Sequence, residues 1–317
     1  MRRAVAVDLG GTNLRAAALD QDGHLTERRH VSSDAAGGPE AVIARIAELV
    51  SEVAGAAGLS ADAPVGVAAP GPLNPETGIV HYTPNLENWR DVPLGPKLEV
   101  LTGRRVHLGN DGNCAVLGEA WFGAAAGARD VVYLALGTGV GAGIISGGRL
   151  LTGRYGLGAE LGHVVVALDG PRCTCGSVGC LEAFVGGWAV AREGRLVAET
   201  ADGSAIRELA QGEPIMPSVI AAAADAGDPA ARAILSRAGR ALGAAIGGFV
   251  NTFNPELVVI GGGLATLGES LLRPAREAIP TYSFPATRDA ARIVSSALGS
   301  DTGLFGAGAL ALASGDV

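Results

Sequence analysis

The chain opens with short apolar runs separated by turn residues. Residues 4–8 (AVAVD) and 14–20 (LRAAALD) are mostly apolar, and Gln21-Asp22-Gly23 forms a polar break before a third run. Short apolar runs bounded by such residues are typical of β-strands. The pattern therefore predicts that three strands open the fold.

Helical periodicity first appears between Glu40 and Ala57, where apolar residues recur at spacings of three and four and predict an amphipathic helix. Residues 64–68 and 106–110 then predict two further strands, each ending in residues suited to a loop. Because ligands of α/β proteins bind at the carboxyl ends of strands, we expect the site at these ends.

A similar order of elements returns near the middle of the chain. Residues 131–136 predict a strand, residues 137–139 a Gly-Thr-Gly turn and residues 140–148 an outgoing strand, with a return strand around residues 163–166. Residues 8–12 have the same strand and Gly/Thr turn. Such repetition predicts two similar units that face each other across a cleft. The alternative is chance recurrence of Gly-Thr pairs in a Gly-rich chain.

The second half of the chain is less regular. Residues 188–227 are Ala-rich and interrupted by Gly and Pro, so helices can be placed there only approximately. Asp228-Pro229 predicts the start of a long helix, as an N-cap followed by proline, and Asn254-Pro255 predicts its end. An apolar strand at residues 257–260 follows, and a final helix is predicted from about Asp301 to Ala313.

Composition narrows the class of protein. A chain of 317 residues exceeds the size at which single cores stop growing, so two lobes are expected. The net charge is -8, and Lys and Arg form no block longer than a pair, which argues against a nucleic-acid partner. No apolar run reaches the roughly 18 residues that a membrane span needs. We therefore expect a cytoplasmic protein without a membrane partner.

The segment from Asp8 to Asn13 joins two predicted strands, so it is a hairpin and not the strand-to-helix turn of a dinucleotide-binding or Walker-type loop. Gly10 and Gly11 let backbone N–H groups approach phosphates, Thr12 adds a donor, and Asp8 can hold Mg2+ through water. A tight hairpin alone would also favour Gly-Gly. Two further clusters at strand ends favour binding of phosphates and adenosine. They are Gly137-Thr138-Gly139 and Gly261-Gly262-Gly263.

Asp111 is the candidate general base. It follows an apolar strand and precedes a helical pattern over residues 113–122, where a carboxylate can point into a cleft. Such a group would accept the proton of a hydroxyl that attacks the γ-phosphorus of ATP. The alternative is that Asn110-Asp111 forms an Asx turn or a helix cap.

Three of the four cysteines fall within eight positions, which indicates a metal rather than disulfides. His163, Cys173, Cys175 and Cys180 match a closed tetrahedral zinc site, so the Zn2+ is predicted to be structural. A core histidine is the alternative for His163, and a zinc ribbon lacks its second cysteine pair here. Cys114 stands apart and is predicted to be a small buried hydrophobe.

Glu160 and Glu182 bracket this predicted metal loop. If zinc orders the loop, both carboxylates can be aimed at one small ligand and accept hydrogen bonds from sugar hydroxyls. The alternative is that they are exposed surface acids.

Taken together, these motifs resemble the ROK family of bacterial sugar kinases and sugar-responsive repressors. The resemblance covers nearly the whole chain, and its most specific part is Cys-x-Cys-Gly-x-x-Gly-Cys-x-Glu at residues 173–182. Within the family the chain is most similar to ATP-dependent glucokinases. The family's repressors carry an N-terminal helix-turn-helix segment, and this chain begins at its first phosphate strand, so we expect no DNA-binding role.

The resemblance implies an actin-like ATPase (ribonuclease H-like) α/β fold of two lobes, with ATP and Mg2+ in the cleft between them. We place a small lobe at residues 1–118, completed by the helix at about 301–317. The large lobe would comprise residues 119–300 with the zinc loop. A homo-oligomer, dimer or tetramer, is also expected.

The resemblance further implies which residues contact the hexose. These are Gly71, Asn85, Asn110, Asp111, Glu160, His163 and Glu182. His163 would bind zinc through one ring nitrogen and the sugar through the other. The expected reaction is phosphorylation of glucose to glucose 6-phosphate. The alternatives are a kinase for N-acetylmannosamine, N-acetylglucosamine, fructose or allose, a non-catalytic sugar-sensing regulator, and polyphosphate as the donor.

Overall fold

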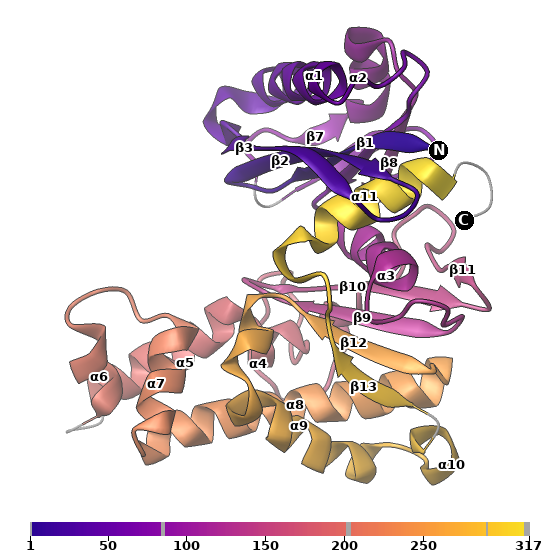
Figure 1. Cartoon of the computed structure of the whole chain (residues 1–317). Coiled ribbons are helices and arrows are strands. Elements are labelled where there is room, and N and C mark those ends of the chain that lie inside the picture. The colour runs from indigo at the N-terminus through magenta and orange to yellow at the C-terminus, as the bar shows by residue number, and fades with distance from the viewer. Residues whose placement is uncertain (1, 84–85, 201–203, 290, 314–317) are drawn as a thin grey trace. The chain divides into compact units, whose positions relative to one another are not determined.

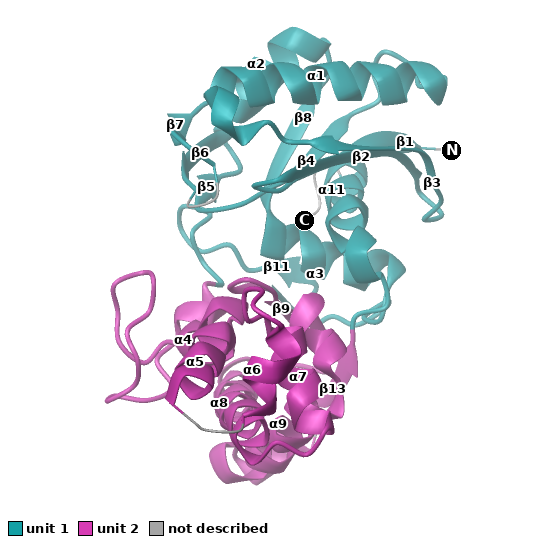
Figure 2. Cartoon of the chain, turned by 90° about the vertical axis from the view of Figure 1, so that its left-hand side faces the viewer, with its two compact units in different colours: residues 1–131, 143–159, 296–317 teal, residues 132–142, 160–295 magenta. Residues whose placement is uncertain are grey.

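The computed structural model describes residues 2–83, 86–200, 204–289 and 291–313. The chain forms two compact units, coloured separately in Figure 2. Unit 1 comprises residues 1–131, 143–159 and 296–317, and unit 2 comprises residues 132–142 and 160–295.

A five-stranded sheet forms the centre of unit 1. Its strands are β1 (Arg3–Leu9), β2 (Asn13–Asp20), β3 (Leu25–Ser32), β4 (Val65–Ala69) and β8 (Val106–Asn110), in the order β3-β2-β1-β4-β8. The first three strands are antiparallel, and β4 and β8 continue the sheet parallel to β1. The predicted opening strands and the two that follow them are confirmed.

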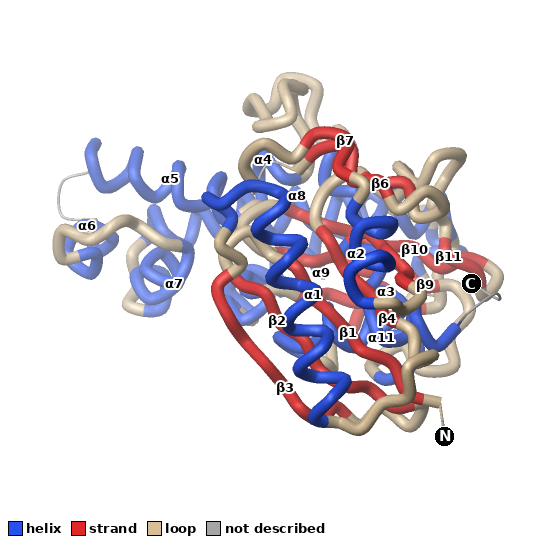
Figure 3. Tube along the Cα trace, turned by 90° about the horizontal axis from the view of Figure 1, so that it is seen from above, coloured by secondary structure: helices blue, strands red, loops and turns tan. Residues whose placement is uncertain are grey.

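Helices cover both faces of this sheet (Figures 1 and 3). α1 (Gly38–Ala56) contacts β1, β2 and β3 and also packs against α2 (Leu94–Thr102). α11 (Thr302–Ala313) contacts β1, β2, β4 and β8, and α3 (Asp111–Phe122) packs against α11. Helices predicted near residues 40–57, 113–122 and 301–313 are therefore present.

Side chains of β1 alternate between these two layers, as the two-residue period of a strand requires. Val5, Val7 and Leu9 belong to the core that α1 closes, whereas Ala4 and Ala6 belong to the core that α11 closes. The α11 side is packed so closely that a Cβ on Gly66 would lie 1.8 Å from the carbonyl oxygen of Ala307. Small residues on this face therefore allow a helix to lie directly on the sheet.

A small second sheet in unit 1 was not predicted. It contains β5 (Leu73–Asn74), β6 (Ile79–Tyr82) and β7 (Arg90–Val92) in chain order. These strands are only two to four residues long, too short for an alternating pattern to stand out.

The predicted duplication appears in the second five-stranded sheet. Its strands are β9 (Val131–Leu136), β10 (Val140–Ser146), β11 (Arg149–Leu150), β12 (Leu257–Gly261) and β13 (Arg292–Ser295). Their order, β11-β10-β9-β12-β13, repeats that of the first sheet. In both sheets an antiparallel hairpin occupies one side and a parallel pair the other.

The predicted return strand at residues 163–166 is wrong. The chain already returns at β11, because Gly147 and Gly148 both have positive φ and form a two-residue hairpin turn. Residues 161–163 form a short 3-10 helix instead, and Val165 makes a single bridge to Cys180.

The second sheet is shared, since β11 and the end of β10 belong to unit 1, and helices make up most of residues 160–295 in unit 2. They are α4 (Glu182–Val185), α5 (Gly187–Thr200), α6 (Ala205–Ala210), α7 (Pro217–Asp225), α8 (Pro229–Phe253), α9 (Glu269–Tyr282) and α10 (Pro285–Arg288). The predicted start and end of α8 are confirmed, since Asp228 accepts hydrogen bonds from two backbone N–H groups of its first turn and Asn254 is left-handed. Among the described residues, no helix is both long enough and apolar enough to cross a membrane.

Candidate functional site

Three parallel strands of unit 1 end at the same edge of their sheet. Asp8 of β1 is in register with Ala68 of β4, and Ala69 is in register with Asn110 of β8. The loop after β4 contains Gly71, whose carbonyl oxygen accepts a 3.2 Å hydrogen bond from Asn110 Nδ2. Asp8, Gly71 and Asn110 therefore all lie at this edge of the sheet, at or just after the strand ends where the strand pattern predicts a site.

Asp111 is the first residue of α3, and Asn110 is its N-cap. The Asn110 side chain accepts hydrogen bonds from the backbone N–H groups of Gly112 and Asn113, so the predicted cap is formed by Asn110. Asp111 is solvent-exposed, and its Oδ1 accepts a 2.8 Å hydrogen bond from Gly112 N. Asp111 thus places a carboxylate at the N-terminus of α3, where negative charge interacts favourably with the helix.

The turn between β1 and β2, residues 10–12, is here called the first turn. Gly10 N donates to Asn13 O at 2.8 Å, which closes the hairpin. Ser33 fixes the turn from β3, because its N–H donates to Thr12 O and its hydroxyl to Gly11 O.

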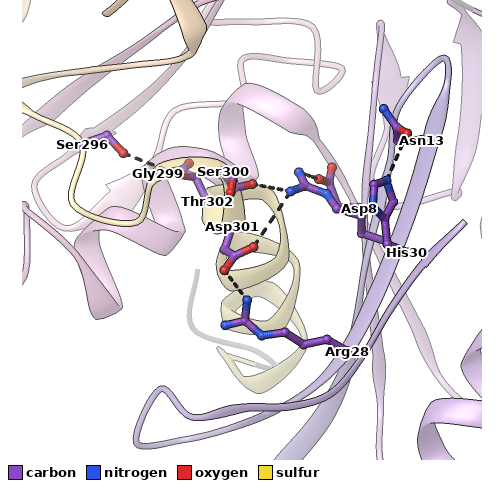
Figure 4. Close-up of polar contacts among 10 residues, drawn as sticks. Asp8, Asn13, Arg28, His30, Ser296, Gly299, Ser300, Asp301 and Thr302 are labelled. Carbon is purple, nitrogen blue, oxygen red and sulfur yellow. Dashed lines mark hydrogen bonds and ion pairs between the residues drawn. The ribbon is translucent and has the colours of Figure 1, made fainter. Parts of the chain in front are cut away.

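A polar network links the strands that flank the first turn to the segment before α11 (Figure 4). Arg15, opposite Asp8 in the β1–β2 register, forms an ion pair with the Asp8 carboxylate. Arg15 also donates to Ser300 O at 2.5 Å. Asp301 accepts a 2.6 Å hydrogen bond from Arg28 of β3. The Arg15–Ser300 hydrogen bond and the Arg28–Asp301 ion pair thus connect the strands to the segment before α11.

The Asp8 carboxylate lies against the first turn of α11. A Cβ on Gly303 would lie 2.6–2.7 Å from three atoms of that carboxylate, so any larger residue there would have to displace it. The sequence analysis missed both Gly303 and Arg15. The available signal was Arg15 itself, a charged residue in an otherwise apolar strand that shares the face of Ala17 and Leu19.

Unit 2 contains the corresponding turn between β9 and β10, residues 137–139, here called the second turn. Gly137 N donates to Gly139 O at 2.9 Å. The first N–H groups of α5 reach this turn, with Gly187 N donating to Gly137 O and Trp188 N to Thr138 O.

The third glycine cluster lies beside the second turn. β12 is the neighbour of β9 in the sheet, and it ends at Gly261. A Cβ on Gly262, which has a positive φ, would lie 2.4 Å from Leu136 O. Two of the predicted nucleotide-binding clusters, residues 137–139 and 261–263, are therefore adjacent in unit 2.

The predicted metal ligands converge. One ligand atom from each of His163, Cys173, Cys175 and Cys180 lies within 4.8 Å of all the others. The Cys175 and Cys180 sulfurs are 3.8 Å apart, and Cys173 Sγ is 3.7 Å from His163 Nδ1. Ligands about 2.3 Å from a tetrahedral zinc ion are separated by about 3.8 Å. The four side chains therefore fit a closed zinc site.

The pKa values of the three cysteine ligands differ. Desolvation acts to raise the pKa of Cys175, but hydrogen bonds from Ser177 and the neighbouring thiols lower it to about 7. Burial raises the pKa values of Cys173 and Cys180. Cys114 is fully buried in unit 1, and burial raises the pKa of its thiol. The prediction that Cys114 is a buried hydrophobe is confirmed.

The two carboxylates that bracket the metal loop differ in environment. Glu160 is exposed, and its carbonyl oxygen accepts a hydrogen bond from His163 N. Glu182 is only 8% exposed, which excludes a surface acid at this position. Its Oε2 accepts from Val140 N at 2.9 Å, and its Oε1 accepts from Thr174 Oγ1 at 3.1 Å. Asn85 lies outside the described residues.

Comparisons with known proteins define the class. The model of the ROK family matches residues 4–314, and the chain belongs to that family. The glucokinase of Thermotoga maritima is 41% identical over 311 residues, covering 97% of this chain and 96% of that protein.

Solved structures agree with this assignment. The ROK family glucokinase of Streptomyces griseus, in complex with glucose and AMPPNP, superposes with a TM-score of 0.82 at 33% identity, covering 97% of this chain and 98% of that one. A ROK family transcriptional regulator, a homologue of the E. coli MLC protein, has a TM-score of 0.84 at 30% identity, covering 98% of this chain and 78% of that one. The fold is the two-lobed actin-like ATPase fold of the α/β class.

Proposed function

We propose that this chain is a glucokinase that transfers the γ-phosphoryl group of ATP to glucose and yields glucose 6-phosphate. The observation that carries the proposal is similarity over 97% of the chain, at 41% identity, to a protein named glucokinase. The Streptomyces griseus structure, with glucose and AMPPNP bound, supports the same substrates.

In this reaction Asp111 accepts the proton of the attacking glucose hydroxyl. Its exposed position at the start of α3, directly after β8, supports the role, since a carboxylate there can reach a substrate hydroxyl and accept its proton. Gly71 and Asn110, hydrogen-bonded to each other beside it, contact the sugar, and we assign Asn85 the same role. We assign Glu160, His163 and Glu182 to sugar binding as well.

Backbone N–H groups of the two turns hold the phosphates. The phosphate-binding segments are Gly10, Gly11 and Thr12 with Asn13 directly after them, and Gly137, Thr138 and Gly139. The N–H groups of Gly10 and Gly137 close their own turns, so the phosphates take the remaining N–H groups. Gly261, Gly262 and Gly263 lie beside the second turn and contact the adenosine. Asp8 is suited to hold Mg2+, which when bound supplies positive charge that offsets the charge of the phosphates.

The four metal ligands hold a structural zinc ion. Because all four positions of a tetrahedral ion are filled by protein side chains, this zinc contributes order rather than an activated water. His163 Nδ1 is directed to the cluster, which leaves Nε2 for the sugar. The fixed tautomer is a consequence of metal ligation.

Replacing Asp111 tests the proposal. Asp111→Asn should lower kcat for glucose phosphorylation by about 10²- to 10⁴-fold, with glucose affinity and melting temperature largely unchanged. Glu269→Gln, which also removes an exposed acid from the first position of a helix, serves as the matched control. A coupled assay for ADP release, run with a panel of hexoses and with polyphosphate, gives the rates. Substantial turnover by Asp111→Asn would remove this residue from the role, and no ADP release with any hexose would refute a kinase.

A further inference from the structure

We infer that Glu182 couples the metal loop, residues 163–180, to the second turn, so that the metal site supports nucleotide binding and not sugar binding alone. The inference rests on the proposed function, because it assigns a nucleotide phosphate to the second turn. It makes Glu182 a positioning residue for that turn, in addition to any contact with sugar.

The first link joins Glu182 to the second turn. Oε2 accepts a 2.9 Å hydrogen bond from Val140 N, directly after the turn, and both partners are buried. The same oxygen lies so close to the turn that a Cβ on Gly139 would be 2.4 Å from it. The carboxylate therefore packs against the backbone that presents the turn's N–H groups.

The second link joins Glu182 to the metal loop. Oε1 accepts from the hydroxyl of Thr174, which stands between the ligands Cys173 and Cys175. Cys173 Sγ itself is 3.7 Å from the same oxygen. Glu182 thus contacts one metal ligand, Cys173, and the residue that stands between two ligands, Thr174.

The third link passes through the start of α5. The Trp188 indole Nε1 donates to Glu182 Oε1 at 3.4 Å, and the Trp188 backbone N–H donates to Thr138 O in the second turn. The adjacent Gly187 N–H donates to Gly137 O. The carboxylate therefore contacts both the turn and the residue that holds the turn from the other side.

A buried carboxylate is sensitive to the loss of any of these donors. Hydrogen bonds to charged groups are stronger than neutral ones, and a buried charge left without a partner is costly. When the metal loop loses order, Glu182 loses the Thr174 hydroxyl and must shift or take up water. Either response moves Val140 and Gly139, and with them the N–H groups that would bind phosphate.

Thr174→Val in the full-length, zinc-loaded chain is the most selective test. Valine keeps the shape of the side chain but removes the hydroxyl, and Thr174 is neither a metal ligand nor a predicted sugar contact. Zinc content, measured by atomic absorption, should be retained, whereas the Kd for AMPPNP by calorimetry should rise about three- to tenfold. Thr252→Val is the control, because that exposed hydroxyl bonds only the carbonyl of Gly248 in α8. An unchanged AMPPNP Kd in Thr174→Val overturns the coupling.

Glu182→Gln gives a second, independent measurement. Glutamine replaces one carboxylate oxygen with an N–H₂ group, which is a hydrogen-bond donor. In one orientation this group faces Val140 N and in the other it faces Trp188 Nε1, so one buried hydrogen bond is replaced by two donors that face each other. The Kd for AMPPNP should rise at least tenfold, and chelation of zinc should raise it in the unaltered chain but add little in Glu182→Gln. A Glu182 that only contacts sugar would change the glucose Kd and leave the AMPPNP Kd unaltered, which refutes the inference.

Failure of the coupling and failure of the proposed function remain distinguishable. AMPPNP binding requires no turnover. If the chain does not phosphorylate glucose but the variants show the expected changes in AMPPNP Kd, the glucokinase proposal is refuted and the coupling stands. If the chain phosphorylates glucose but both variants have an unchanged AMPPNP Kd, the coupling is refuted and the glucokinase proposal stands. If the chain does not bind AMPPNP at all, both are refuted.

Discussion

The first and second turns occupy the same position in two sheets of the same strand order, yet they are held in different ways. The first turn is bonded directly by Ser33, whose N–H donates to Thr12 O and whose hydroxyl donates to Gly11 O. The strands that flank this turn carry the partly buried Asp8–Arg15 ion pair, and Arg15 also donates to Ser300 O before α11. The second is supported by the buried carboxylate of Glu182 and, through it, by the metal loop. A repeated backbone therefore does not imply repeated supports, and each turn should respond to a different perturbation.

Metal removal should separate the two turns most strongly. Cys175→Ala, or chelation of the unaltered chain, should abolish zinc binding and lower the free energy of unfolding by more than about 3 kcal/mol. Hydrogen exchange should accelerate at the amide of Val140 while the amide of Gly10, in unit 1, keeps its protection. Equal acceleration at both amides would contradict separate support.

Gly303→Ala should affect the first turn alone. The added Cβ must displace the Asp8 carboxylate or shift α11, which costs about 1–3 kcal/mol of stability. The Mg2+ concentration needed for half-maximal turnover should also rise. Gly248→Ala is the control, because a Cβ there meets open space in α8. A Gly303→Ala chain as stable and as active as the control would show that the contact is unimportant.

Arg15→Ala should have a smaller effect. Its guanidinium is partly buried beside Asp8, so its removal should destabilise the chain by about 1 kcal/mol and raise the KM for Mg-ATP. Denaturant unfolding and steady-state kinetics measure the two effects. Arg15→Lys should recover part of the loss, since it keeps the charge but not the second donor to Ser300; no recovery would argue that packing, rather than charge, is the support.

Arg28→Ala should have the smallest effect in this series. Its side chain is 54% exposed, and exposed ion pairs contribute little, so the free energy of unfolding should change by less than about 0.5 kcal/mol. Urea unfolding at low salt and at 0.5 M salt should give the same ranking of Arg15 above Arg28. If Arg28→Ala lowered the free energy of unfolding more than Arg15→Ala, the ion pair with Asp301, and not the one with Asp8, would be the main support of the first turn.

Local patterns predicted the elements that depend on neighbours in sequence. The strand pairs around both turns, the capped start of α8 at Asp228 and the cluster of three cysteines with His163 are all specified within short stretches. Helix α9 was not predicted, since Pro274 and Pro280 interrupt its interior. The return strand was misplaced because the Gly147-Gly148 turn was not recognised.

Contacts between distant residues were beyond such patterns. Arg15 and Ser300 are 285 positions apart, and nothing in the sequence around either residue indicates that the two are in contact. The same holds for Asp8 and Gly303, whose proximity depends on how α11 lies on the sheet. The burial of Glu182 likewise arises from three segments that meet only in the folded unit.

The position of α11 also bears on how the protein is made. This helix covers the face of the sheet that carries Ala4 and Ala6, although it follows the whole of unit 2 in the chain. Until α11 is synthesised, that face lacks its main cover, so unit 1 begins to form before unit 2 but cannot finish folding before it is made. Ribosome-bound intermediates lacking residues 302–313 should accordingly remain open to chaperones and proteases until α11 has emerged.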